Sequence, residues 1–115
     1  MATNYAISFN REGKNSGSKK VTLDLLNLKK SALVIRAINH KLRQQIMKLI
    51  DDEKRINVTQ IFVKLRIEQS VASQHLAILR RAGFVNVERD KKFIFYTVNT
   101  TRIEELNEFM NALLP

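Results

Sequence analysis

Uncharged polar side chains are spaced along one side of a helix that the sequence predicts from Gln69 to Ala82. Ala72, Leu76 and Leu79 form its apolar side, so the residues between them fall on the opposite side. That opposite side carries Gln69, Ser70, Ser73, Gln74 and Ala77. A Gln amide can bond N6 and N7 of adenine, and a Ser hydroxyl can bond a base or a phosphate. We therefore predict that Gln69, Ser70, Ser73 and Gln74 contact base edges of double-stranded DNA. A merely solvated polar face is the alternative.

Positive charge surrounds this predicted helix. The chain has 20 Lys and Arg residues against 11 Asp and Glu residues, a formal net charge of +9. The surplus lies before residue 93, because residues 93–115 hold one base, Arg102, against three Glu residues. A polyanion is attracted to such a surface through its phosphates. Our phosphate-contact candidates are Arg43, Lys64, Arg66, His75, Arg80, Arg89, Lys91 and Lys92. Each of these side chains has a solvated surface position as its alternative.

A second helix and a short turn position the polar face. Asn57 and Gln60 have the spacing of a capping box, which predicts a helix start just before Val58. The turn Arg66–Glu68 leads into the helix at Gln69, and Gly83 suits the left-handed position after that helix. Two helices joined in this way predict a helix-turn-helix, whose second helix enters the major groove. A helix pair that binds nothing is the alternative.

An alternating pattern follows this helix pair. Residues 85–89 alternate between apolar and polar side chains, and residues 93–98 are β-branched or aromatic. Between them, Asp90, Lys91 and Lys92 form a predicted hairpin tip next to Arg89. Three cations on such a wing can reach phosphates or the minor groove. A charged tip that only keeps the hairpin soluble is the alternative.

Flanking helices are predicted from Val21, with Thr22 as N-cap, from about His40 to Ile50, and from Thr101 to Leu114. The fold class is therefore mainly α with a small β-hairpin wing (α+β), a winged helix-turn-helix with five helices. Residues 1–20 are expected to be a flexible basic tail, and residues 21–115 the DNA-binding and dimerisation domain. Apolar residues of the first and last helices exceed what a small domain buries, which favours a dimer over a completed monomer core. The dimer candidates are Leu23, Leu26, Leu33, Val34, Leu106, Phe109, Met110 and Leu113.

Between about Ala37 and Val98 the chain resembles the ArsR/SmtB winged-helix repressors. The resemblance rests on Arg43, Ile46, Met47, Leu49 and Ile50, on residues 70–79, on residues 82–85, and on Phe95 and Tyr96. It implies a homodimer assembled through the first and last helices, an inverted-repeat operator, and repression by blocking a promoter. It also implies base contacts by Gln69, Ser70, Ser73 and Gln74. The chain departs from the family at Glu68, where a small hydroxyl residue is usual, and at the wing tip, which lacks glycine.

The sequence lacks the residues that several other functional classes require. The sequence has no Cys, and residues 101–115 have no His, so the metal ligands of the family's metal sensors are missing and we expect no metal and no cofactor. Separated histidines without a phosphate loop or clustered carboxylates predict that the chain is not an enzyme. No apolar run predicts a membrane segment, and Met1 to Asn10 do not resemble a signal peptide, so a cytoplasmic protein is expected. No pattern identifies a small-molecule effector. A winged-helix module that binds protein instead of DNA is the alternative function.

Overall fold

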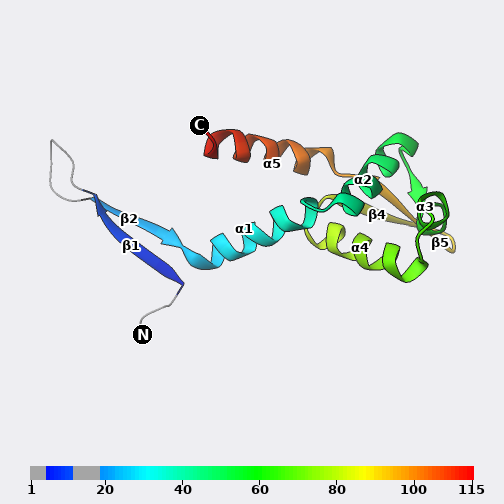
Figure 1. Ribbon diagram of the computed structural model, residues 1–115, viewed down its shortest axis with the longest axis horizontal. Coiled ribbons are helices and arrows are strands. Elements are labelled where there is room, and N and C mark those ends of the chain that lie inside the picture. Colours follow the sequence, from blue (N-terminus) through cyan, green and yellow to red (C-terminus); the bar gives the residue numbers. More distant parts are fainter. Residues whose placement is uncertain (1–4, 12–18) are drawn as a thin grey trace. The chain divides into compact units, whose positions relative to one another are not determined.

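The computed structural model describes residues 5–11 and 19–115 (Figure 1). Within these residues the chain forms five helices, a two-stranded sheet and a three-stranded sheet. The elements are β1 (Ala6–Arg11), β2 (Lys19–Asp24), α1 (Leu25–Ile38), α2 (Lys41–Glu53), β3 (Ile56–Asn57), α3 (Val58–Leu65), α4 (Gln69–Arg81), β4 (Val85–Asp90), β5 (Phe93–Val98) and α5 (Thr100–Leu113). They divide into two compact units, residues 1–35 and residues 36–115.

In the first unit, β1 and β2 pair as an antiparallel ribbon that leads directly into α1 (Figure 1). Ile7 lies opposite Leu23 and Phe9 opposite Val21, so their side chains share one face of the ribbon. The described strand residues before Val21 differ from the disordered tail predicted for residues 1–20. Residues 1–4 and 12–18 of that prediction lie outside the described residues. The expected domain boundary after residue 20 also differs from the division of the units between residues 35 and 36.

The start of α1 is a correction to the sequence prediction. Residues 21–24 belong to β2, and α1 begins at Leu25, so Thr22 is not the N-cap. The carboxylate of Asp24 instead accepts a hydrogen bond from the backbone N–H of Asn27 over 3.0 Å. Val21 and Thr22 are β-branched and favour a strand once a partner strand is present, which the helical spacing of the later leucines concealed.

The second unit contains the predicted helix-turn-helix. The Asn57–Gln60 capping box is confirmed, because Asn57 Oδ1 accepts from Gln60 N at 2.9 Å and Gln60 Oε1 accepts from Asn57 N at 3.2 Å. Side chains from α2, α3, α4 and the sheet meet in one core. Its largest fully buried members are Phe84, Ile46, Ile50, Ile56, Ile61, Leu76 and Leu79. The core therefore fixes α3 and α4 against each other.

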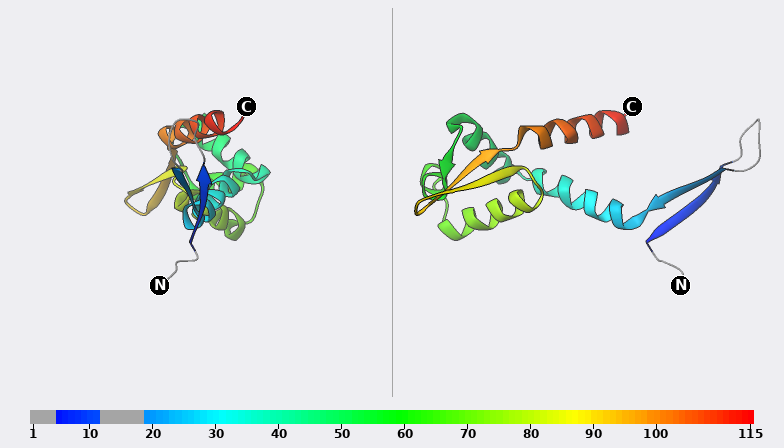
Figure 2. Two further views of the ribbon diagram at one scale, coloured as in Figure 1. Left: turned by 90° about the vertical axis from the view of Figure 1, so that its left-hand side faces the viewer. Right: turned by 180° about the vertical axis from the view of Figure 1, so that it is seen from behind.

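The three-stranded sheet has the strand order β3-β5-β4 and includes the predicted wing. The wing hairpin β4–β5 protrudes from the helices and connects α4 to α5 (Figure 2). Asp90 pairs with Phe93, so the tip is the two-residue turn Lys91–Lys92. Lys91 takes a left-handed backbone conformation with φ 57°, at a tip where the sequence offers no glycine. The mainly α winged-helix fold class is thereby confirmed.

Gly83 provides a test of how α4 ends. Its φ is +87°, and a Cβ atom there would lie 3.2 Å from Nε of Arg102. That Nε donates to the carbonyl of Ala82 at 3.0 Å. We expect Gly83→Ala to lower the free energy of unfolding by about 1–2 kcal/mol, because the left-handed backbone is strained by a side chain. Urea denaturation of Gly83→Ala and of the exposed-site control Ser73→Ala measures this, and equal midpoints would contradict it.

No helix in the described parts of the chain has the length and apolar character needed to cross a membrane.

Candidate nucleic-acid interface

The exposed side of α4 carries all four predicted base-contact residues. Ala72, Leu76 and Leu79 are at most 1% exposed and anchor the opposite side of the helix in the core. Gln69, Ser70, Ser73 and Gln74 are all exposed, as is Ala77. Fixed packing on one side thus presents amides and hydroxyls on the other. Such a surface can donate to and accept from base edges without a charge that would favour phosphate alone.

The turn before α4 has a defined geometry. Arg66 caps α3 in a left-handed conformation with φ 55°, and its N–H bonds to the carbonyls of Phe62 and Val63. Glu68 is the N-cap of α4, and its carbonyl accepts from Ala72 N at 3.0 Å. Within the described residues, the Glu68 side chain makes no capping hydrogen bond. A free carboxylate therefore stands at the first turn of the helix, where it interacts favourably with the helix dipole.

Six of the predicted phosphate-contact residues are exposed: Lys64, Arg66, Arg80, Arg89, Lys91 and Lys92. Lys64 on α3 pairs with Glu53 of α2, so part of its charge is already balanced. Arg80 lies on α4 itself, and Arg66 lies in the turn before it. The six exposed cations thus lie on four consecutive parts of the chain: α3, the turn after it, α4 and the β4–β5 wing.

The seventh and eighth candidates, Arg43 and His75, face the protein. Arg43 is only 8% exposed, and its guanidinium donates to the carbonyls of Ala37 and Arg36 at 2.6 and 3.3 Å. This burial argues against the predicted phosphate contact. Arg43 was a phosphate-contact candidate on its charge alone, because a sequence does not show which carbonyls lie near a side chain in the fold. His75 is half-buried and meets Arg43 through Nδ1, which leaves Nε2 as the ring nitrogen open to a further partner.

The acidic residues of the wing share one cationic partner that the sequence pattern did not reveal. Arg55, just before β3, pairs with Glu88 and Asp90 at 3.4 and 3.3 Å. Its guanidinium carbon also lies 3.6 Å from the ring centroid of Phe95. Glu88 and Asp90 are two apart on one strand and so share a face, which was the available signal. Among the ion pairs of the described residues, none involves the wing cations Arg89, Lys91 or Lys92.

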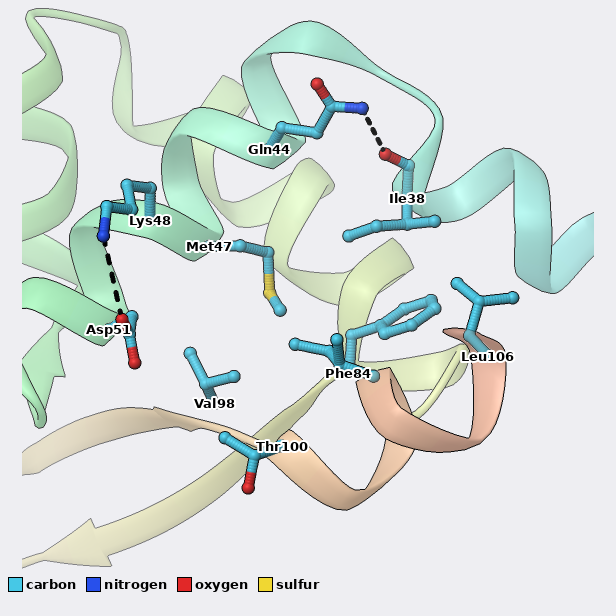
Figure 3. Close-up of a pocket in the computed structure, with 10 residues that line it drawn as sticks. Ile38, Gln44, Met47, Lys48, Asp51, Phe84, Val98, Thr100 and Leu106 are labelled. Carbon is cyan, nitrogen blue, oxygen red and sulfur yellow. Dashed lines mark hydrogen bonds and ion pairs between the residues drawn. The ribbon is translucent and has the colours of Figure 1, made fainter. Parts of the chain in front are cut away.

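An apolar pocket of about 410 Å³ lies beside α5 in the second unit. Figure 3 shows Met47 of α2, Phe84 and Val98 with their side chains directed into it, and Leu106 of α5 at its edge. Lys48 and Asp51 stand at another edge, and Gln44 donates to the carbonyl of Ile38 at 2.9 Å. The apolar lining continues onto α5 through Leu106.

The predicted dimer residues of α5 form one helical stripe in which none is fully buried. Leu106 and Met110 are half-buried, while Phe109 and Leu113 are 46% and 67% exposed. In the first unit, Leu26 and Leu33 of α1 are exposed and Val34 is half-buried. Leu23 lies on β2 instead of the predicted helix and is exposed there. In the described parts of the chain, α5 contains no buried residue, so its apolar side is available to a partner.

Comparisons with known proteins agree with this geometry. The sequence profile of the family described as bacterial regulatory protein, arsR family, matches residues 40–87, from the N-cap of α2 into β4. The transcriptional activator HlyU of Vibrio cholerae is 32% identical over 87 residues, which are 76% of this chain and 80% of the relative. The solved structure of that HlyU covers 76% of this chain and 94% of its own, with a TM-score of 0.60.

Two further proteins extend the comparison. The transcriptional repressor PagR of Bacillus anthracis is 28% identical over 91 residues, 79% of this chain and 91% of the relative. Its crystal structure has a TM-score of 0.60, with 76% and 99% of the two chains covered. A homodimeric winged helix-turn-helix DNA-binding domain from Mycobacterium bovis is 22% identical, covers 76% and 81% of the chains, and has a TM-score of 0.63. At that identity the last comparison shows the fold alone.

Proposed function

The chain belongs to the arsR family of bacterial regulatory proteins, and from this premise we propose that it is a homodimeric repressor that binds an inverted-repeat DNA operator. Its relatives bear the names of transcriptional regulators, and the winged helix-turn-helix is a DNA-binding fold. A DNA-binding regulator is therefore the general function. Three finer points are proposed: which residues read the operator, how two copies assemble, and the sign of regulation.

The exposed, uncharged side of α4 carries the proposal. Gln69, Ser70, Ser73 and Gln74 meet base edges in the major groove, and small side chains at positions 73 and 77 allow a close approach. Arg66 and Arg80 contact phosphates on either side of the groove. The wing cations Arg89, Lys91 and Lys92 contact the backbone next to it. Phosphate contacts thus hold the helix in place, and the amides and hydroxyls supply the sequence preference.

The homodimer is supported by the apolar stripe of α5 and the leucines of α1. Exposed stripes of this kind are a liability in a monomer and are expected at an interface between copies. A two-fold dimer places two recognition helices in successive major grooves, so the half-sites are separated by about one helical turn of 10–10.5 base pairs. The homodimeric domain from Mycobacterium bovis has the same fold.

We infer repression because a dimer bound at a promoter would block that stretch of DNA. A dimer that covers two successive major grooves excludes other proteins from that stretch of DNA. The relatives include one named activator and one named repressor, so the sign depends on where the operator lies in a promoter. A reporter gene placed downstream of the selected operator tests the sign of regulation. Repression requires that expression of the reporter be lower when the protein is present.

Selection of bound duplexes from a random library tests base reading. We expect the wild-type protein to enrich an inverted repeat, and the variant Gln69→Ala, Ser73→Ala, Gln74→Ala to enrich no preferred sequence. Each bidentate base contact discriminates against the wrong base by about 1–3 kcal/mol, whereas phosphate contacts are independent of sequence. The variant therefore keeps non-specific binding, whose affinity falls steeply as salt concentration rises.

The matched control is the variant Gln45→Ala, Asn107→Ala, Asn111→Ala, which removes three exposed amides from α2 and α5. It should retain the wild-type preference. An unchanged preference in the α4 variant would exclude these residues as readers. Failure of the wild-type protein to bind any duplex at low salt would favour a protein-binding module instead.

A further inference from the structure

Arg43 connects three helices through one buried guanidinium. It is on α2, and Nε and Nη2 donate to the carbonyls of Ala37 and Arg36 in the last turn of α1. Its Nη1 lies 3.1 Å from Nδ1 of His75 on α4. His75 lies next to Gln74, one of the proposed base readers. Among the described hydrogen bonds, His75 is the only side chain of α4 that bonds Arg43. It is therefore next in sequence to a proposed base reader.

The chemistry of this contact fixes the state of the histidine. A guanidinium has only N–H donors and remains protonated, so Nδ1 of His75 must be the acceptor. The ring is therefore neutral, with its proton on Nε2. His40 adds to this environment, since its ring centroid is 4.9 Å from that of His75. Nδ1 of His40 is meanwhile engaged as the α2 cap, accepting from Arg43 N at 3.4 Å.

The surroundings of His75 disfavour protonation of its ring. Partial burial lowers the pKa of His75 below its ordinary value of 6.5, and the neighbouring His40 and Arg43 lower it further. The neutral acceptor therefore predominates at pH 7.5. As the pH falls through the lowered pKa, the ring takes up a proton and can no longer accept from Arg43.

We propose that Arg43 is a positioning residue for DNA reading: by donating to neutral His75 it fixes the rotation of α4, and specific affinity depends on that bond. This inference rests on the proposed function. Leu76 and Leu79 anchor one side of α4 in the core, so loss of the bond leaves the fold intact but lets the helix turn slightly about its axis. What changes is the orientation of Ser73 and Gln74 towards the base edges.

Two substitutions at position 75 distinguish the effect of the hydrogen bond from the effect of side-chain packing. His75→Asn keeps an acceptor near the position of Nδ1, whereas His75→Leu has similar bulk without an acceptor. At pH 7.5 we expect His75→Leu to lose about tenfold in affinity for the selected operator, the effect of one hydrogen bond to a charged group. His75→Asn should recover most of that loss, to within about threefold of wild type. Fluorescence anisotropy on operator and random duplexes measures both values.

The pH dependence of specific DNA affinity is a second measurement. Loss of side-chain packing alone would not change it. The ratio of operator to random-duplex affinity should fall in the wild-type protein when the pH is lowered from 8 to 5.5, and should stay flat in His75→Asn. In the absence of DNA, Arg43→Gln should raise the pKa of His75 as followed by NMR, because a nearby positive charge is removed.

The outcomes distinguish this inference from the proposed function. Equal operator affinities for the Leu and Asn variants, parallel pH profiles, or an unmoved His75 pKa in Arg43→Gln would each overturn the positioning role while DNA binding stands. If the wild-type protein bound no duplex, the proposed function would fail, and the NMR titration would still decide whether Arg43 and His75 interact.

Discussion

The free energy of unfolding should fall by about 3–5 kcal/mol when Phe84 is replaced by Ala, the range for a large aromatic side chain removed from a core. Phe84 is 0% exposed and is the largest fully buried side chain among the described residues. It follows Gly83 at the junction of α4 and β4, where its N–H bonds to the carbonyl of Leu79 and its carbonyl accepts from Asn99 N, both at 2.9 Å. The substitution therefore leaves a cavity where helix, sheet and α5 meet, and thermal and urea unfolding measure the loss.

Phe93→Ala is the matched control, because it removes the same atoms from a side chain that is 45% exposed on the wing. We expect a loss of about 1 kcal/mol or less there. Small domains have a total stability of about 5–15 kcal/mol, so the Phe84 variant alone should lose a large part of its folded population on mild heating. Similar losses at both positions would show that the core is centred elsewhere.

The sequence predicted the elements whose signals are local. The capping box at Asn57, the left-handed Gly83 and the apolar spacing of α4 each depend on residues within a few positions of one another, and the structure confirms all three. The polar side of α4 was predictable for the same reason. Once Leu76 and Leu79 are assigned to the core, helical geometry alone places Ser73 and Gln74 outside.

Features that depend on distant partners were not predictable in this way. Arg43 looks like a surface cation until the last carbonyls of α1 are brought next to it. Arg55 likewise finds Glu88 and Asp90 only after β3 has joined the sheet. The β1–β2 ribbon has a weak alternating pattern, and isolated two-stranded ribbons are marginal in water, so its strands were assigned to a tail and to the start of a helix.

Operator affinity should fall by at least about 100-fold when Phe109 and Leu113 are both replaced by Glu. In the proposed dimer the two recognition helices are linked, so the second half-site binds at high effective concentration. Two carboxylates per copy on the apolar stripe of α5 oppose burial at an interface and should give a monomer. Because Phe109 and Leu113 are exposed in the single chain, its own core is preserved. Sedimentation equilibrium measures the assembly, and anisotropy on the inverted repeat measures the affinity.

Asn107→Glu with Asn111→Glu is the control, since it adds the same charge to the same helix at exposed polar positions. It should stay dimeric and lose much less affinity, which separates the interface from simple repulsion between carboxylates and phosphate. On a duplex with a single half-site, the monomeric variant should bind about as well as the control, because each recognition helix is intact. A Phe109, Leu113 variant that remained a dimer would place the interface on other residues, and a monomer with full operator affinity would refute the two-fold mode of reading.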